Sequence, residues 1–540
     1  MSIAEPPRFE PAVTATTANG WSNLGSNGSG NGALNSHVYA ATIYGGDLYV
    51  GGNFYQGLPN STSLDFLAKW NGSAWSSVGS NGSGGPAIGG RVYALHVSGG
   101  NLLVGGDFTN AGGDPQADEL AVWNGTTFSD IANIANGTTV SDPFNFGEIH
   151  AIASNQSSLF FGGYWYNSPV LGGSSGNPGD MVLSYDGTWH SMGASNTGDG
   201  PIQCQVDALV ATETHVYAGG CFTNVYSDGT IEFAARFDID NFVWEAMDNA
   251  GPGIHSIGGT VHALAMSGTD LYVGGEFLNA DNIADADYLA KWNTATSSWS
   301  DVGGTLPNGF VRSIAVSGTN VYVGGDFIQS PGPMDHVAKW NGSTWSALGS
   351  NGSNDGALFG KVNALALTST SLYAGGEFQN AGVIPEADYI ASYGLSTGKQ
   401  KPDGRIRKGS GTLGGNNIYN TTGLNQTRSG STTVGNTITF TISIQNDGTG
   451  AGRFGVAATS SGNVNFQVKY FRGTTEITSA VVAGTYTTGS VGVGNSIAIT
   501  AKVKVVPAVI VGSPTTRLIT ITSLADASKI DAVKFTATRT

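Results

Sequence analysis

Residues 311–325, VRSIAVSGTNVYVGG, contain the pattern that decides the fold, and residues 92–106, VYALHVSGGNLLVGG, repeat it. In each stretch an apolar strand turns through Ser-Gly into a second apolar strand that ends in Gly-Gly. The Gly-Gly pair occurs seven times, at spacings of 54, 57, 57, 55, 50 and 51 residues, and its first members are Gly51, Gly105, Gly162, Gly219, Gly274, Gly324 and Gly375. A period of about 50 residues built from short strands is typical of propeller blades. The sequence therefore predicts an all-β chain whose larger part is a seven-bladed β-propeller.

The composition agrees with a turn-rich β protein. Gly occurs 82 times in 540 residues and charged residues make up only 11%, yet hydrophobic residues reach 40% and fall at regular positions. Regularly placed apolar residues distinguish such a chain from a disordered one. No run of 18 apolar residues predicts a membrane helix, and the first 20 residues lack the apolar segment of a signal peptide. We therefore expect no membrane insertion.

The seventh blade needs a strand from the other end of the ring. Each earlier blade has a short outer strand that usually begins with Trp, but after Tyr393 the chain continues without one. Residues 21–25, WSNLG, match residues 75–79, WSSVG, and residues 345–349, WSALG. A closing strand of this kind would remove the open sheet edges of the ring. We predict that the N-terminal strand completes blade seven, with Trp21 and Leu24 at the closure.

The residue pattern of the repeat resembles a known propeller type. Gly-Gly, an aromatic residue in the third strand and Trp at the start of the fourth are similar to kelch repeats. The pattern GGDFxNAGG followed by AKWNGSxWSxLG resembles kelch-like repeats of bacterial exported proteins over residues 21–393. The resemblance implies a propeller and leaves the activity open, because propellers serve as enzymes, lectins and scaffolds.

The C-terminal part changes to alternating strand patterns. They cover residues 437–445, 463–471, 496–506, 516–524 and 531–539. Several such strands separated by turns predict an immunoglobulin-like β-sandwich. The segments PDGRIRKG, KYFRGTTEIT and VVAGTYTTG resemble an Ig-like module that ends bacterial surface proteins. We therefore expect an extended arm at 1–20, the propeller at 21–393, a linker at 394–410 and the sandwich at 411–540.

The net charge of −16 divides unequally along the chain. Residues 1–398 contain 8 Lys and Arg against 34 Asp and Glu, a net charge of −26, whereas residues 399–540 contain 15 against 5, a net charge of +10. The acidic larger part argues against nucleic acid as a partner. Opposite charges favour head-to-tail contact between copies, although each domain having its own surface charge is an equally simple explanation.

One variable position of the repeat is a candidate ligand site. The second residue of each inner strand varies among polar types, although its neighbours hardly change between blades. We name these seven residues the mouth ring: Tyr39, Tyr93, His150, Asp207, His262, Arg312 and Asn363. Inner strands line a propeller channel, so these side chains are expected to converge at one channel mouth. A solvated rim that tolerates any polar residue is the alternative.

Other repeated residues have structural explanations. An acid lies five residues before each third-strand aromatic, at Asp65, Asp118, Asp180, Glu232, Asp287, Asp335 and Asp388. Because a blade repeat separates these acids around the ring, we expect each to accept backbone N–H bonds rather than share a metal ion. No nucleophile–base set, acid pair or metal-ligand spacing is visible. We therefore predict no catalytic residues, no enzyme activity, no metal and no cofactor.

The two cysteines, Cys204 and Cys221, lie on either side of the first hairpin of blade four. Folding that hairpin brings them roughly opposite each other. A cross-strand disulfide would imply an oxidising compartment. Two buried free thiols are the alternative.

These observations favour an extracellular structural protein that assembles head to tail into a filament or surface layer. The arm that precedes the closing strand would dock on a neighbouring copy, either as an added β-strand or by other packing. Its candidate contact residues are Ile3, Pro6, Pro7, Phe9, Pro11 and Val13. One alternative is an adhesin or glycan-binding propeller displayed on a cell surface, and another is a virion fibre or decoration protein.

Overall fold

The computed structural model describes two compact units, which divide the chain at Met1–Leu395 and Ser396–Thr540. The described residues are 20–540 without 28–29, 56–63, 132–146, 166–180, 194–200, 226–230, 248–255, 305–307, 330–331, 352–355, 396–399, 449–451, 460–465, 490, 493, 508–509 and 525–528. The expected arm, including Ile3, Pro6, Pro7, Phe9, Pro11 and Val13, lies almost entirely outside them. Among the helices that are described, none has the length and hydropathy to cross a membrane.

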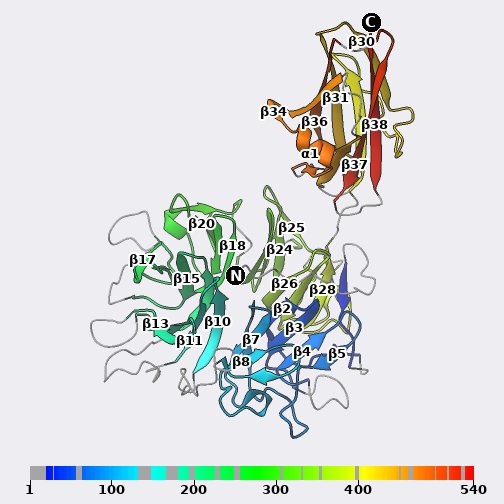
Figure 1. Ribbon diagram of the computed structural model, residues 1–540. Coiled ribbons are helices and arrows are strands. Elements are labelled where there is room, and N and C mark those ends of the chain that lie inside the picture. The colour runs from blue at the N-terminus through cyan, green and yellow to red at the C-terminus, as the bar shows by residue number, and fades with distance from the viewer. Residues whose placement is uncertain are drawn as a thin grey trace. The chain divides into compact units, whose positions relative to one another are not determined.

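The first unit is a seven-bladed propeller of four-stranded antiparallel sheets, as predicted (Figure 1). Blade one consists of β2 (Val38–Tyr44), β3 (Asp47–Gly52), β4 (Leu67–Trp70) and β5 (Trp75–Ser77). Blade two consists of β6 (Val92–Ser98), β7 (Asn101–Gly106), β8 (Leu120–Trp123) and β9 (Phe128–Ser129). Blade three consists of β10 (Glu148–Ser154), β11 (Leu159–Tyr164), β12 (Val182–Tyr185) and β13 (Trp189–Ser191).

The remaining blades repeat this order. Blade four consists of β14 (Val206–Ala211), β15 (His215–Gly220), β16 (Ala234–Asp238) and β17 (Val243–Ala246). Blade five consists of β18 (Val261–Ser267), β19 (Asp270–Gly275), β20 (Leu289–Asn293) and β21 (Ser298–Asp301). Blade six consists of β22 (Val311–Ser317), β23 (Asn320–Gly325), β24 (Val337–Trp340) and β25 (Trp345–Ala347). Blade seven consists of β26 (Val362–Leu367), β27 (Ser371–Gly376), β28 (Ile390–Gly394) and β1 (Trp21–Asn23).

The N-terminal strand closes the ring as predicted. β1 pairs with β28 in the register Trp21 to Tyr393, and β26 contacts β2, so the inner strands form a closed circle. Trp21 donates its Nε1–H to the carbonyl of Leu348 in blade six at 2.6 Å. The carbonyl of Leu24 in turn accepts the Nε1–H of Trp75 in blade one. The borrowed strand therefore bonds to both neighbouring blades.

The same tryptophan bond recurs between other blades. Trp244, Trp299 and Trp345 each donate to the preceding blade, to the carbonyl three residues after that blade's own outer-strand tryptophan. These partners are Met192, Met247 and Val302, at 2.7, 2.6 and 3.0 Å. Trp21 and Leu24 occupy the same two places in this pattern, which explains why the sequence match at residues 21–25 identified the closing strand.

The Gly-Gly pair is required by two close approaches. A Cβ on the first glycine of each blade would lie closer than 3.0 Å to a Val or Ile at the first or second position of the next blade's inner strand; Gly375 of blade seven meets Val38 of blade one. A Cβ on the second glycine would lie closer than 3.0 Å to the carbonyl oxygen that precedes its own inner strand, as at Gly52 and His37. Glycine therefore allows both the packing between blades and the packing of strand two on strand one.

Four of the seven repeated acids hold the turn before the third strand, as expected; Asp180 lies outside the described residues. Asp118, Asp287, Asp335 and Asp388 each accept a backbone N–H from the preceding loop at 2.6–2.8 Å. Asp335 and Asp388 also accept an N–H from the segment leading into the next blade, at 3.0 and 3.1 Å. The residue after the acid has a left-handed conformation in all seven blades: Phe66, Glu119, Met181, Phe233, Tyr288, His336 and Tyr389. These four carboxylates are thus structural, because they fix a turn with a left-handed residue.

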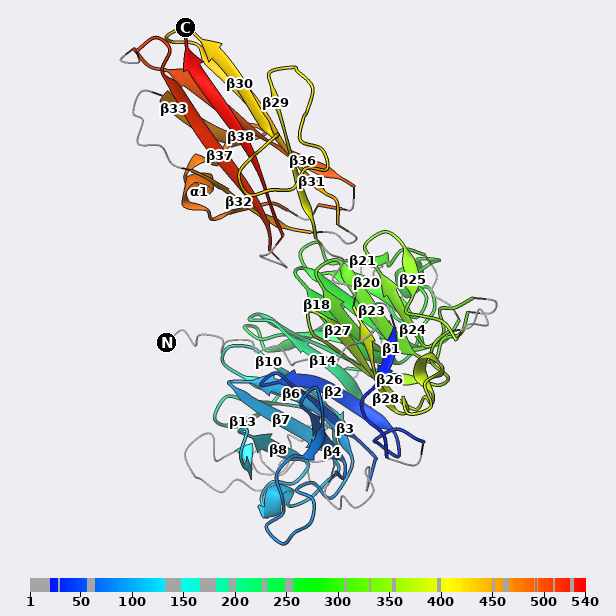
Figure 2. The ribbon, with the colours of Figure 1, turned by 90° about the vertical axis from the view of Figure 1, so that its right-hand side faces the viewer.

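The second unit is a β-sandwich of two five-stranded sheets (Figure 2). One sheet has the order β29 (Pro402–Lys408), β31 (Thr437–Asn446), β36 (Ser496–Val505), β33 (Phe466–Arg472) and β34 (Thr475–Glu476). The other has the order β30 (Thr427–Thr432), β38 (Ile530–Arg539), β37 (Pro514–Ser523), β32 (Phe454–Ala458) and β35 (Tyr486–Thr487). The short helix α1 (Thr478–Ala483) lies between β34 and β35 in the sequence. Phe440 and Phe535 stack between the sheets with ring centroids 4.6 Å apart.

The expected linker at 394–410 needs correction. Gly394 is the last residue of β28, and β29 already pairs with β31, so the sandwich begins before residue 411. The basic segment at 402–408 resembled a linker because Arg405 and Arg407 dominate it. Ile406, between them, is fully buried in the core of the sandwich.

Candidate functional site: the channel mouth

All seven residues of the mouth ring are β-bulge residues. In each blade the pairing of the first two strands shifts by one residue at this position, so the bulge residue has no partner opposite it; in blade one Val38 pairs with Gly52 and Ala40 with Gly51. The same shift occurs at Tyr93, His150, Asp207, His262, Arg312 and Asn363. Bulges redirect a side chain and are frequent at barrel rims and beside binding sites.

The Gly-Gly pair and the bulge belong to one local structure. The carbonyl that precedes the bulged strand accepts the N–H of the residue following Gly-Gly, as in Glu276 to Thr260 at 2.8 Å. The second glycine leaves room for that carbonyl. Each blade therefore presents three side chains at the mouth: the residue before the inner strand, the bulge residue and the residue after Gly-Gly.

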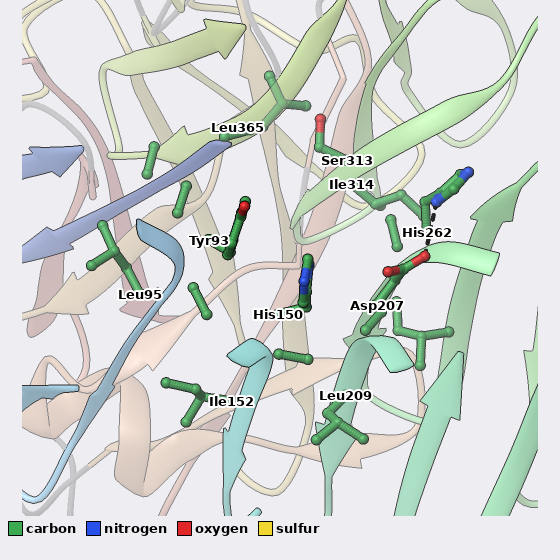
Figure 3. Close-up of a pocket in the computed structure, with 18 residues that line it drawn as sticks. Tyr93, Leu95, His150, Ile152, Asp207, Leu209, His262, Ser313, Ile314 and Leu365 are labelled. Atoms are coloured by element: carbon green, nitrogen blue, oxygen red, sulfur yellow. Dashed lines mark hydrogen bonds and ion pairs between the residues drawn. The ribbon is translucent and has the colours of Figure 1, made fainter. Parts of the chain in front are cut away.

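Four of the seven bulge residues open onto a cavity of about 220 Å³ in the channel (Figure 3). Tyr93, His150, Asp207 and His262 line its polar side. The two positions after the bulge form a floor of mostly Ala in the first layer, such as Ala263, and mostly Leu and Ile in the second, with Ser313 as a polar member. The cavity is smaller than the ~300–1,000 Å³ of ordinary small-molecule pockets. Tyr39, Arg312 and Asn363 lie outside its lining but belong to the same ring.

Three rings of neighbouring blades stack along one side of the mouth. Tyr39 stacks on Tyr93 with centroids 5.4 Å apart, and Tyr93 stacks on His150 at 4.4 Å. The Arg91 guanidinium lies 5.4 Å from the centre of the Tyr93 ring. Burial, and then the charge of Glu148, raise the pKa of Tyr93. Tyr93 therefore stays a neutral hydrogen-bonding group at physiological pH.

His262 lies between two carboxylates. Its Nδ1 is 3.2 Å from Asp207 Oδ2 and its Nε2 is 2.9 Å from Glu276 Oε1. Burial lowers the pKa of His262, but the hydrogen bonds to Asp207 and Glu276 outweigh burial and leave the pKa above its ordinary value. Gln205 donates to the other oxygen of Asp207. The carboxylate of Asp207 is thus held in one orientation at the cavity.

The remaining members complete the circle. Arg312 Nη2 is 3.2 Å from Asp326 Oδ2, which also lies 4.0 Å from Lys361 Nζ. Asn363 donates to the carbonyl of Val38 in blade one at 3.3 Å. The polar contacts therefore continue from blade six across blade seven to the start of the ring.

The mouth carries an excess of negative charge. Six carboxylates take part in its ion pairs, and we name them the rim acids: Asp107, Glu148, Asp207, Glu276, Asp326 and Glu377. The permanent cations in the same pairs are Arg91, Arg312 and Lys361. The mouth thus favours a ligand or partner group with positive charge.

Sequence reasoning found the bulge residues but missed their polar neighbours. Arg91 and Gln205 stand immediately before an inner strand, Glu148 at the equivalent position is the first residue of β10, and four rim acids follow a Gly-Gly pair. The sequence signal that could have identified them is that two further positions of the repeat vary among polar residues: the one at the start of the inner strand and the one after Gly-Gly. Among the described residues, no three His, Cys, Asp or Glu side chains are placed to hold a metal ion. The absence of a cofactor remains a prediction.

Cys204 and Cys221 are joined by a disulfide. The bond links the segment before the inner strand of blade four to the residue after its Gly-Gly pair. It therefore lies at the mouth end of this blade, next to Gln205.

Comparison with known families agrees with the fold. Residues 182–381 match the family model described as the Rax2 C-terminal beta propeller domain. The matched segment begins in blade three and ends in blade seven. No curated protein matches the chain.

Proposed function

We propose that the chain is a non-enzymatic structural protein of the cell exterior, which assembles head to tail into a filament or surface layer. The observation that supports this most directly is the opposite charge of two independently packed units, −26 for residues 1–395 and +10 for residues 396–540. Complementary charges steer association and set its orientation. A contact between unlike surfaces that does not close on itself produces an open fibre.

Other features support an extracellular, surface-associated role. The disulfide between Cys204 and Cys221 suits an oxidising compartment. We assign the repeats to the kelch-like type of bacterial exported proteins and the sandwich to the Ig-like modules of surface proteins, on the sequence resemblance above. In this proposal the partners are other copies of the chain, and neither nucleic acid nor membrane insertion is involved.

The N-terminal arm is proposed as one contact between copies. β30 is the terminal strand of its sheet, and terminal strands are where an added strand can pair. Deleting residues 1–18 should leave β1 and the propeller intact while weakening polymerisation. Filaments that persist unchanged in this truncation would exclude the arm as a required contact.

Electron microscopy and light scattering of the purified full chain test the assembly itself. We expect a mass that grows with protein concentration, and polymers whose formation slows as NaCl is raised from 50 to 500 mM, because salt screens the steering charges. A chain that remains monomeric at every concentration would contradict the proposal.

A second candidate function is ligand binding at the mouth, as in a surface adhesin or glycan-binding propeller. The convergence of Tyr93, His150, Asp207 and His262 on one cavity favours it. A glycan array should then show selective binding that is lost when His150, His262 and Arg312 are replaced together by Ala. An array without selective binding would leave this candidate unsupported.

A further inference from the structure

The sandwich presents two aliphatic side chains to solvent at one end. Ile510 and Val511, in the connection between β36 and β37, are 77% and 66% exposed. Their backbone is anchored: Gly512 donates to the carbonyl of Arg539, and Arg539 Nη1 donates to the carbonyl of Pro507 at 3.2 Å. We name Ile510 and Val511 the apolar tip. Two such neighbours form a small apolar surface, which becomes a candidate contact only where a complementary surface exists.

The tip lies at the end of the sandwich opposite to where the chain arrives from the propeller. β29 begins at Pro402, which pairs with Asn446 at the end of β31. The other end of β31, Thr437, pairs with Lys504, directly before the connection that holds the tip. The tip therefore lies at the end of the sandwich away from the start of β29, which we call the free end.

The charges at this end are positive. Lys504 is exposed on β36, and Arg539 is the last residue of β38 beside the tip. The opposite end carries both signs of charge: Asp403, Asp447 and Asp531 lie there with Lys401, Arg453 and Lys529. The free end thus combines an apolar centre with basic neighbours.

The channel mouth has the complementary arrangement. Its floor consists mostly of Ala, Leu and Ile side chains with Ser313 among them, and the rim acids outnumber the permanent cations six to three. At about 220 Å³ the cavity is too small for a typical drug-sized ligand, but it has the scale of projecting side chains. Figure 3 shows the branched floor residues Leu95, Ile152, Leu209, Ile314 and Leu365 together with the four bulge residues that line the cavity.

We propose that the apolar tip of one copy inserts into the channel mouth of the next. This inference rests on the proposed head-to-tail assembly and names its contact. Ile510 and Val511 cover the apolar floor, while Arg539 and Lys504 face the rim acids. Because the tip and the mouth are different surfaces on different units, each copy offers one of each, and the contact propagates.

The contact needs more area than the tip alone supplies. A stable interface buries roughly 1,200–2,000 Å². Leu278, Ile328 and Phe359 are 53%, 52% and 51% exposed. They lie in blades five and six and just before blade seven, beside strand ends that open at the mouth. These residues extend the apolar surface around the cavity that the end of the sandwich would cover.

Complementation between variants of the full chain tests the contact. The tip variant is Ile510→Asp with Val511→Asp, and the mouth variant is Asp207→Lys. Each alone should raise the concentration needed for polymerisation at least tenfold. An equimolar mixture should stop at a dimer, since one intact mouth meets one intact tip. The chain with both changes should stay monomeric. Multi-angle light scattering after gel filtration measures these masses.

Controls separate this contact from misfolding and from the broader assembly. Leu424→Asp changes an exposed apolar residue of the same unit and should polymerise like the wild type. Glu276→Lys replaces Asp207→Lys if circular dichroism shows that the latter is unfolded. If the wild type polymerises and the tip variants polymerise equally well, the tip contact is wrong but the proposed head-to-tail assembly is still supported. A wild type that never polymerises would overturn both.

Discussion

At the residue scale, the Gly-Gly pair matters because of what approaches it. The first glycine allows the next blade to pack, and the second allows a carbonyl of its own blade to lie where a Cβ would be. Conformational freedom is not the reason, since none of the seven pairs has a left-handed φ. The repeat therefore preserves two close contacts beside the mouth ring, which any side chain at these positions would prevent.

Gly275→Ala should destabilise the propeller by about 1–3 kcal/mol, because the added methyl meets the backbone oxygen of Thr260, which cannot move alone. Gly258→Ala in the same blade is the matched control. A Cβ there has no atom within 4 Å, and a change of less than about 0.5 kcal/mol is expected. Urea unfolding followed by tryptophan fluorescence compares the two. Equal stability of both variants would show that the close approach at Gly275 is readily relieved.

The two buried histidines should respond to pH with opposite sign. The pKa of His262 is raised above ~6.5 in the folded state, so its protonated form contributes stability that is fully present below about pH 6.5 and is lost as the pH rises through the folded pKa. Burial lowers the pKa of His96 to about 4, so its contribution is present above ~6.5 and is lost as the pH falls toward 4.

Thermal melts between pH 4 and pH 9 measure this difference. The stability lost in His262→Gln should be greater at pH 6 than at pH 9. For His96→Gln the loss should be greater at pH 7 than at pH 4. Identical pH profiles for the two variants would contradict the assignment of their environments.

At the element scale, β1 behaves as an outer strand that happens to come first in the chain. It pairs with β28 along all three of its residues, and it takes part in the tryptophan bonds on both sides. Its removal would leave the edge of β28 open and the Nε1–H of Trp75 without its acceptor. An unpaired buried polar group costs about 1–3 kcal/mol, and an open edge invites aggregation.

Deleting residues 1–25 should therefore lower the melting temperature and produce aggregates, whereas deleting residues 1–18 should not. Circular dichroism melts and gel filtration compare the two truncations at equal concentration. If the longer deletion melts like the shorter one, the closing strand contributes no measurable stability.

At the scale of the whole molecule, the two units have separate cores. The sandwich core consists only of residues from the second unit, and Phe440 and Phe535 lie within it. A unit of 145 residues, Ser396–Thr540, is large enough to bury most of its apolar surface alone.

We expect residues 396–540 and residues 1–395 to fold as separate proteins. The unfolding profile of the full chain should equal the sum of the two separate profiles, measured by differential scanning calorimetry. A sandwich that is unfolded by itself, or a single joint transition, would show that the units depend on each other.

The sequence by itself determined the number of blades, their closure by residues 21–25 and the structural role of the repeated acids. These features recur because the same hydrogen bonds and close approaches must be made in every blade. Their period can therefore be recognised in the amino-acid sequence. The seven left-handed turn residues that follow the repeated acids, the first being Phe66 and the last Tyr389, show no such repeated residue type in the sequence. Their left-handed conformation is imposed by the bonds around them rather than by their own preference.

Only the tertiary structure decided which side chains meet. Asp207 and His262 are 55 residues apart and become neighbours because closing the ring places adjacent blades side by side. The bulge that directs them toward the channel depends on strand pairing, and a single strand does not reveal its register. The basic strand at 402–408 was hidden for the same reason, because burial of Ile406 is set by the sheets that cover it.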